Sequence, residues 1–158
     1  MPMDHAEALP TIVAFLRGVG IEVEAATLPE DGFLPAIAVR DGRLLYDLDR
    51  LFHPGDLLHE GGHIAVTDPA LRATVSAFDS NGGDEMAAIG WSYAAALAAG
   101  IDPSVVFHDH GYRGGGQAIL ENFAEGRFLG VPMLQYYGLT RFAHEGGEQY
   151  PTMIKWLR

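Results

Sequence analysis

The five residues His59-Glu60-Gly61-Gly62-His63 are the feature that most limits how this chain can fold. Two leucines precede this segment, and an isoleucine, an alanine and a valine follow it, so Glu60 is the one carboxylate in an apolar stretch. The apolar residues recur at helical spacing, which predicts a helix over about residues 54–68. Because residues four apart lie on the same face of a helix, His59 and His63 can bind one metal ion.

Glu60 and the two glycines favour a functional interpretation of this helix. Glu60 follows His59 directly, where its carboxylate can take a proton from a water molecule at the metal and act as general base. A pair of adjacent glycines inside a helix costs roughly 2 kcal/mol relative to alanines. Burial of Glu60 without a positive partner is also unfavourable. The alternative interpretation is a helix with two structural histidines and no metal ion.

A hydrolytic zinc site needs a third protein ligand, with a fourth position left open for water. A third histidine six residues after His63 is excluded, because that position is Pro69. Glu85 is the best candidate, since it is a carboxylate at the head of an otherwise apolar helix. Asp84 or Asp79 could serve instead. In the alternative reading, Glu85 only interacts with the dipole of its helix.

These residues resemble the zincin metallopeptidases, specifically the branch whose third ligand is a glutamate. A small hairpin before the metal helix and an alanine-rich helix behind it are similar to the compact ImmA/IrrE-type members, and the resemblance covers about residues 34–99. It implies that His59, His63 and Glu85 bind one Zn²⁺ per chain, that Glu60 activates water, and that the substrate is a peptide or protein. The chain departs from the larger glutamate-liganded enzymes, because no Asn precedes Glu85 and no Ser-Asp pair follows it.

Two other functions stay open. Two histidines and one carboxylate also suit a non-haem Fe(II) enzyme, although such a site has no need of the adjacent Glu60. A zincin-like fold could also be a binding or regulatory module in which zinc is only structural. Residues 144–148 (His-Glu-Gly-Gly-Glu) repeat the start of the metal motif but lack its second histidine, so we interpret them as a coincidence in a loop.

Residues 107–116 form the most loop-like part of the sequence and contain further polar candidates. Proteolysis requires a donor that stabilises the oxyanion of the tetrahedral intermediate, and His110, Tyr112 or Arg113 could supply it from a lid or rim. These three residues are therefore predicted to bind substrate. The alternatives are a solvated polar loop, or a weakly spaced second metal site that uses His108 and His110.

The pattern of apolar residues predicts an α+β fold of one domain over residues 1–158, with a small antiparallel sheet packed on a mainly helical, zincin-like core. The sequence Asp41-Gly42 between two apolar runs is a strong hairpin signal. The expected strands cover 21–24, 36–39 and 44–46. Apart from the metal helix, the expected helices cover 5–16, 70–78, 84–99, 117–129, 132–137 and 152–157.

Composition excludes several classes of function. The 158 residues include 21 acidic and 10 basic side chains, a net charge of −11, which argues against nucleic acid and anionic membranes as partners. The absence of cysteine excludes disulfides, thiolate metal sites and a cysteine nucleophile. The sequence carries no recognisable export signal or membrane span, so we expect a soluble, cytoplasmic protein.

Overall fold

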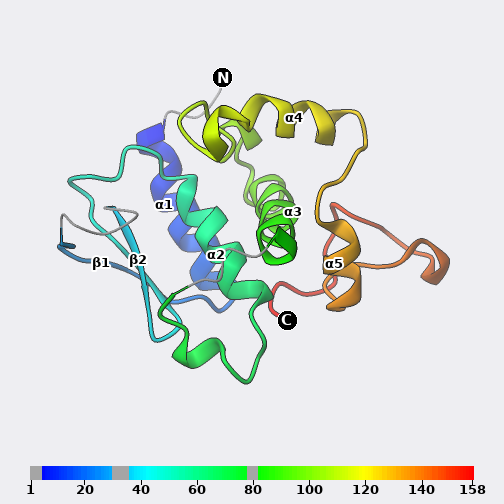
Figure 1. The fold of residues 1–158 in the computed structure, drawn as a ribbon, viewed down its shortest axis with the longest axis horizontal. Helices are drawn as coiled ribbons and strands as arrows, with labels where there is room; N and C mark the ends of the chain where they lie inside the picture. Colours follow the sequence, from blue (N-terminus) through cyan, green and yellow to red (C-terminus); the bar gives the residue numbers. More distant parts are fainter. Residues whose placement is uncertain (1–4, 30–35, 78–81) are drawn as a thin grey trace.

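The computed structural model describes residues 5–29, 36–77 and 82–158 of the chain. These residues form five α-helices and one three-stranded sheet, in the order helix, sheet, helices (Figure 1). The predicted α+β class is therefore confirmed. The first helix, α1 (His5–Gly18), buries Ile12 and Leu16 completely and ends before Gly20, whose φ of +100° favours glycine.

The sheet consists of β1 (Val23–Ala25), β2 (Ile37–Arg40) and β3 (Arg43–Tyr46), in the order β1-β3-β2. The predicted hairpin is confirmed, because β2 and β3 are antiparallel and both turn residues, Asp41 and Gly42, have positive φ angles of 50° and 74°. The sheet is not antiparallel throughout, however. β1 pairs in parallel with β3, because the chain crosses over after β1 and β2 runs opposite to both strands.

The helix pair α2 (Asp56–Val66) and α3 (Gly82–Ala99) forms the centre of the molecule. These helices approach each other closely at Gly62. A Cβ atom at this position would lie 2.9 Å from the main-chain oxygen of Ala88 and 3.3 Å from Cε3 of Trp91. Gly62 therefore has a packing role, because any larger residue would separate α2 from α3.

The chain after α3 is more irregular than the sequence predicts. It contains α4 (Gly116–Ala124), which is shorter than expected, and α5 (Val131–Tyr136). The prediction of a helix over residues 152–157 is wrong, because this segment is irregular in the structure. That segment is instead held by tertiary bonds, since Nε1 of Trp91 donates to the main-chain oxygen of Trp156, 2.9 Å away. The end of the segment lies against the last turn of α2 (Figure 1).

The segment between α2 and α3 also differs from the expectation. The helix predicted over residues 70–78 is reduced to one 3₁₀ turn, Arg72–Thr74, and residue 78 lies outside the described part. The reason is a long-range bond: the main-chain oxygen of Val75 accepts from the N–H of Gly42 at 2.8 Å, so the segment is tied to the hairpin turn.

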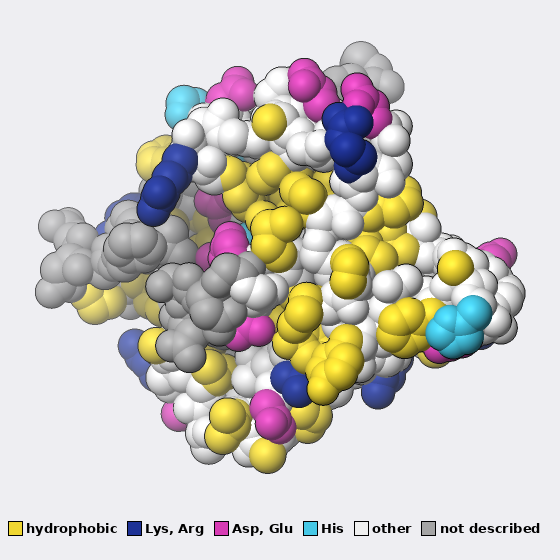
Figure 2. Space-filling view, turned by 45° about the vertical axis from the view of Figure 1, so that its right-hand side comes forward, with side chains coloured by type: hydrophobic (Ala, Val, Ile, Leu, Met, Phe, Trp, Pro, Cys, Tyr) yellow, Lys and Arg dark blue, Asp and Glu magenta, His cyan; other side chains and the backbone are white. Residues whose placement is uncertain are grey.

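Several large apolar side chains are exposed near the C-terminal end of the chain. Figure 2 shows apolar side chains gathered on the face that carries α4 and α5. In the described part of the chain after α3, four large apolar side chains are exposed: Phe128, Tyr136, Phe142 and Ile154. Among the described residues, no helix combines the length and apolar character that a membrane span requires.

Candidate metal centre

Four polar side chains share one face of α2 at the spacing i, i+3, i+4 and i+7: Asp56, His59, Glu60 and His63. Successive members of such a set lie one above the other along a helix. The remaining surface of α2 is apolar and buried against the core. The sequence therefore places the polar groups of this helix on one face, where His59 and His63 meet Glu85 from the first turn of α3.

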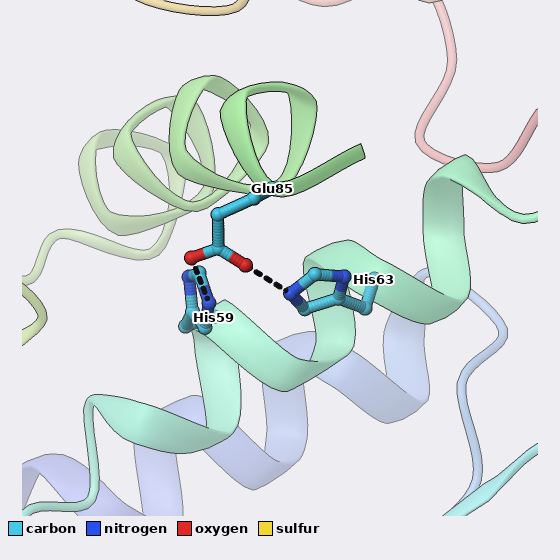
Figure 3. A group of neighbouring side chains, drawn as sticks. All are labelled: His59, His63 and Glu85. Atoms are coloured by element: carbon cyan, nitrogen blue, oxygen red, sulfur yellow. Dashed lines mark hydrogen bonds and ion pairs between the residues drawn. The ribbon is translucent and has the colours of Figure 1, made fainter. Parts of the chain in front are cut away.

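The three predicted ligands converge between the two helices (Figure 3). Nε2 of His59 lies 3.1 Å from Oε1 of Glu85, and Nε2 of His63 lies 2.9 Å from Oε2 of the same carboxylate. One ligand atom from each residue lies within 4.8 Å of the other two, so the group could hold a metal ion. His63 is buried, whereas the side chain of Glu85 is 41% exposed, which leaves the site open on one side.

The other predicted third ligands do not join this group. Asp84 is absent from it, and its carboxylate accepts instead from the Tyr137 hydroxyl at 3.5 Å. Asp79 lies outside the described residues. Glu85 was preferred from the sequence, and the structure places it next to both histidines.

The charges of His59, His63 and Glu85 shift the pKa values within this group. Hydrogen bonds from His59 and His63 hold the pKa of Glu85 well below its usual range, although burial opposes this. Burial also opposes the protonation of His59, but the hydrogen bond and charge of Glu85 outweigh it and raise the pKa of His59. The Glu85 carboxylate thus favours a protonated, positively charged His59 imidazole at the point where the predicted ligand atoms meet. A metal ion bound there would compete with these protons.

Glu60 differs from the ligands, because within the described residues it makes no hydrogen bond or ion pair. Burial raises its pKa. The positive charges of His59 and His63 oppose that shift, whereas Glu85 and Asp56 add to it. A carboxyl group with a raised pKa and no bonding partner, one residue from a ligand, is suited to accept and return a proton.

The loop over residues 107–116 brings one of its three predicted substrate-binding residues to the centre. The ring of Tyr112 packs edge-on against His59, with 5.2 Å between ring centroids. Its hydroxyl is buried and has no hydrogen-bond partner among the residues that the structure describes. Burial raises the pKa of Tyr112, and the carboxylates of the site add to the shift. Arg113 and His110 are exposed, and His110 instead lies 5.2 Å from the ring of His53.

Sequence reasoning missed one contact of this loop, the pair of His108 and Asp56. Nε2 of His108 lies 2.7 Å from Oδ1 of Asp56, 52 residues earlier in the chain. The only available signal was that Asp56 lies on the same helix face as His59 and Glu60. In the part of the chain that the structure describes, no second group of metal-ligand atoms forms, so the alternative of a second metal at His108 and His110 is not supported.

A cavity of about 430 Å³ opens beside His63. Its wall combines apolar side chains from the end of α2 and from the segment before α3 with charged groups, among them Val66, Leu71, Val75, Asp84 and Arg158. The guanidinium group of Arg158 lies 4.1 Å from the centre of the Tyr137 ring. The cavity is large enough to take an amino-acid side chain next to His63, the one predicted ligand that lines it.

Comparisons with protein-family models, with curated proteins and with solved structures find no match to this chain. The chemistry of the site is therefore argued from its geometry and from the properties of its side chains.

Proposed function

We propose that this chain is a zinc-dependent metallopeptidase of the zincin type. In this proposal His59, His63 and Glu85 hold the ion, and Glu60 is the general base. The observation that carries the proposal is that two adjacent helices supply three groups that could hold the ion and a separate carboxylate beside them. Three predicted ligand atoms converge within 4.8 Å, whereas Glu60 shares the helix face with two of these residues and its carboxylate makes no hydrogen bond or ion pair within the described residues.

The donor set fits zinc, which takes imidazole nitrogens and carboxylate oxygens in catalytic sites with three protein ligands. A bound Zn²⁺ would polarise a carbonyl group and make a water molecule more acidic. The same donors also fit Fe(II). Glu60 favours hydrolysis over that alternative, because hydrolysis needs a base beside the metal.

The side chains supply the other requirements of peptide hydrolysis. Glu60 accepts a proton from the attacking water and returns it to the leaving amine, and its raised pKa assists the return. The buried hydroxyl of Tyr112 has no acceptor within the described part of the chain, so it can donate to the oxygen of the scissile carbonyl as negative charge develops.

Strand β2 is suited to align an extended peptide, because it lies at the outer edge of the sheet. The turn that follows β2 is bonded to the segment beside the cavity. The N–H of Asp41 donates to Oγ of Ser76 at 3.0 Å, and Ser76 lines the cavity next to His63. We infer that a peptide added to β2 would place a side chain in this cavity.

The test combines metal analysis with peptide cleavage. We expect about one zinc per chain in wild-type protein purified without chelators. Glu60→Gln should keep the zinc and lose cleavage of a peptide library, and His63→Ala should lose the zinc. The sequence repeat provides matched controls, because His144→Ala and Glu145→Gln change the same residue types in a remote loop and should alter neither property.

Each contrary outcome identifies a different error. Iron in the purified protein would favour the Fe(II) alternative. Zinc with no cleavage that depends on Glu60 would favour a binding module with structural zinc. Absence of any metal, even after zinc is added back, would overturn the metal site itself.

A further inference from the structure

We propose that His108 is a positioning residue that fastens the loop 107–116 to α2 through Asp56 and thereby holds the Tyr112 hydroxyl at the metal centre. The fastening of the loop stands on its own contacts. Its effect on catalysis rests on the proposed function.

The first observation is the bonding of His108, which uses both ring nitrogens. Its Nδ1 accepts from the main-chain N–H of His110 at 3.2 Å. Nε2 therefore carries the hydrogen and donates to Oδ1 of Asp56 at 2.7 Å. Asp56 is the first residue of α2, one turn before His59. The bond thus joins the loop directly to the helix that carries two ligands.

The second observation is the enclosure of the His108 ring, whose side chain is only 7% exposed. The ring of His53 stacks on it, with 3.8 Å between centroids and 9° between planes. Gly111 lies close by: a Cβ atom at this position would come within 3.2 Å of Cε1 of His108. The imidazole is therefore held by packing as well as by its two hydrogen bonds.

The third observation is the backbone of the residues that follow. Tyr112 and Arg113 both have a φ of 55°, in the left-handed region that side chains other than glycine rarely adopt. Two such residues in succession persist only where the surrounding structure holds them. His108, whose ring is held by hydrogen bonds and by stacking, lies four residues before Tyr112 in the same loop.

The strained turn has a definite consequence for Tyr112. It directs the ring between Phe107, at 5.3 Å between centroids, and His59, at 5.2 Å. The ring is thereby held beside the predicted ligand His59, and its hydroxyl is buried without a partner in the described part of the chain. If the loop were released, this phenol could turn outward and bind water, so the bond between His108 and Asp56 keeps it in place.

The first experiment measures the loop and needs no enzymatic activity. Trypsin cleaves after Arg113, which is exposed in the loop, and after Arg127, which is exposed outside it and serves as internal reference. Local opening exposes a backbone to proteases. We expect His108→Ala to raise the ratio of cleavage at Arg113 to cleavage at Arg127 by about tenfold, as followed by mass spectrometry.

Matched variants separate the bond from general damage. His108→Gln keeps a donor near the position of Nε2, and His110→Ala removes an exposed imidazole from the same loop, so both should resemble the wild type. Asp56→Ala removes the acceptor from a side chain that is 38% exposed, and it tests the same bond if His108→Ala does not fold. An unchanged cleavage ratio in both His108→Ala and Asp56→Ala would overturn the proposal.

The second experiment measures the link to Tyr112 in the zinc-loaded protein. Loss of an oxyanion donor lowers kcat by about 100-fold, and we expect His108→Ala and Tyr112→Phe each to lower kcat in this range while KM and zinc content stay unchanged. A variant that combines His108→Ala with Tyr112→Phe should have the same kcat as Tyr112→Phe alone. Independent, multiplying losses would show that His108 does not act through Tyr112. A wild type without peptidase activity would overturn the proposed function and leave the proteolysis result intact.

Discussion

The substitution Gly62→Ala tests whether the close approach of two helices creates the metal centre. The added Cβ would lie 2.9 Å from the main-chain oxygen of Ala88, whereas ordinary contacts begin near 3.4 Å. Because the obstructing atom belongs to the backbone, side-chain rotation cannot relieve the contact. α3 must therefore move away from α2 by about 0.5 Å, the difference between these two distances.

This displacement is large for a metal site and modest for the fold. Glu85 lies one helical turn from Ala88 and moves with it, whereas ligand distances tolerate only about 0.2 Å. We expect zinc affinity to fall by about 10–100-fold, as for other changes that misplace ligands. Overpacking costs about 1–3 kcal/mol, and the better helix propensity of alanine returns about 1 kcal/mol. The metal-free protein should thus lose only about 0–2 kcal/mol of stability.

The neighbouring glycine is the control. At Gly61 an added Cβ would lie 2.7 Å from Cδ2 of Leu16, the end of a flexible side chain on α1, and would not meet α3. Gly61→Ala should therefore change stability and leave zinc affinity close to that of the wild type. Competition with a chromophoric chelator measures the affinity, and thermal unfolding with chelator measures stability. Equal losses of affinity in the two variants, or none in Gly62→Ala, would refute the reasoning.

Three further predictions follow from the site and the sheet. Glu60→Gln should keep the metal and lower kcat by about 10²–10⁴-fold, measured on the best peptide substrate. The raised pKa of His59 stabilises the folded protein at pH values below 6.5, the ordinary pKa of histidine, and this stabilisation is lost as the pH rises. The lowered pKa of Glu85 stabilises the folded protein at pH values above 4.5, the ordinary pKa of glutamate, and this stabilisation is lost as the pH falls. Unfolding with chelator should therefore show the largest difference between wild type and Glu85→Gln between pH 4.5 and 6.5; a difference that grows toward pH 9 would contradict this. Val39→Pro should raise KM for extended peptides relative to Val39→Thr, and undiminished cleavage in a folded Val39→Pro protein would argue against alignment along β2.

The ligands on α2 were predictable because they depend on local geometry alone. Helical periodicity places His59 and His63 on one face, whatever surrounds the helix. Glu85 was predictable for a chemical reason, since a carboxylate at the head of an apolar helix suggests a positively charged neighbour. The structure supplies that neighbour in the two histidines, at 3.1 and 2.9 Å.

The placement of Tyr112 was not predictable from the sequence, although the residue was among the candidates. Its position depends on two left-handed residues and on the bond between His108 and Asp56, which joins positions 52 residues apart. The sequence shows Asp56 as a favourable charge at a helix N-terminus and on the same face as His59, but it does not show the bond to His108. A long-range bond of this kind leaves no periodic signal.

The errors in the predicted fold also come from long-range contacts that the sequence does not show. The hairpin turn at Asp41-Gly42 was predictable, because its backbone conformation is set by two residues. The parallel pairing of β1 depends on how the chain crosses over, and the irregular segments over residues 70–77 and 152–157 depend on bonds to distant residues. Local preference for helix is outweighed there by tertiary contacts.

The two glycines connect the argument from sequence with the argument from structure. In the sequence they lower the helix propensity of this segment, which suggests a functional reason for their presence. In the structure Gly62 lets α3 approach until Glu85 reaches both histidines, and Gly61 lets α1 pack on the opposite side. A larger residue at Gly62 would preserve the spacing of the histidines and still separate them from their third partner. Gly62 therefore belongs to the candidate metal centre as much as the predicted ligands do, because it sets the distance between the helices that carry them.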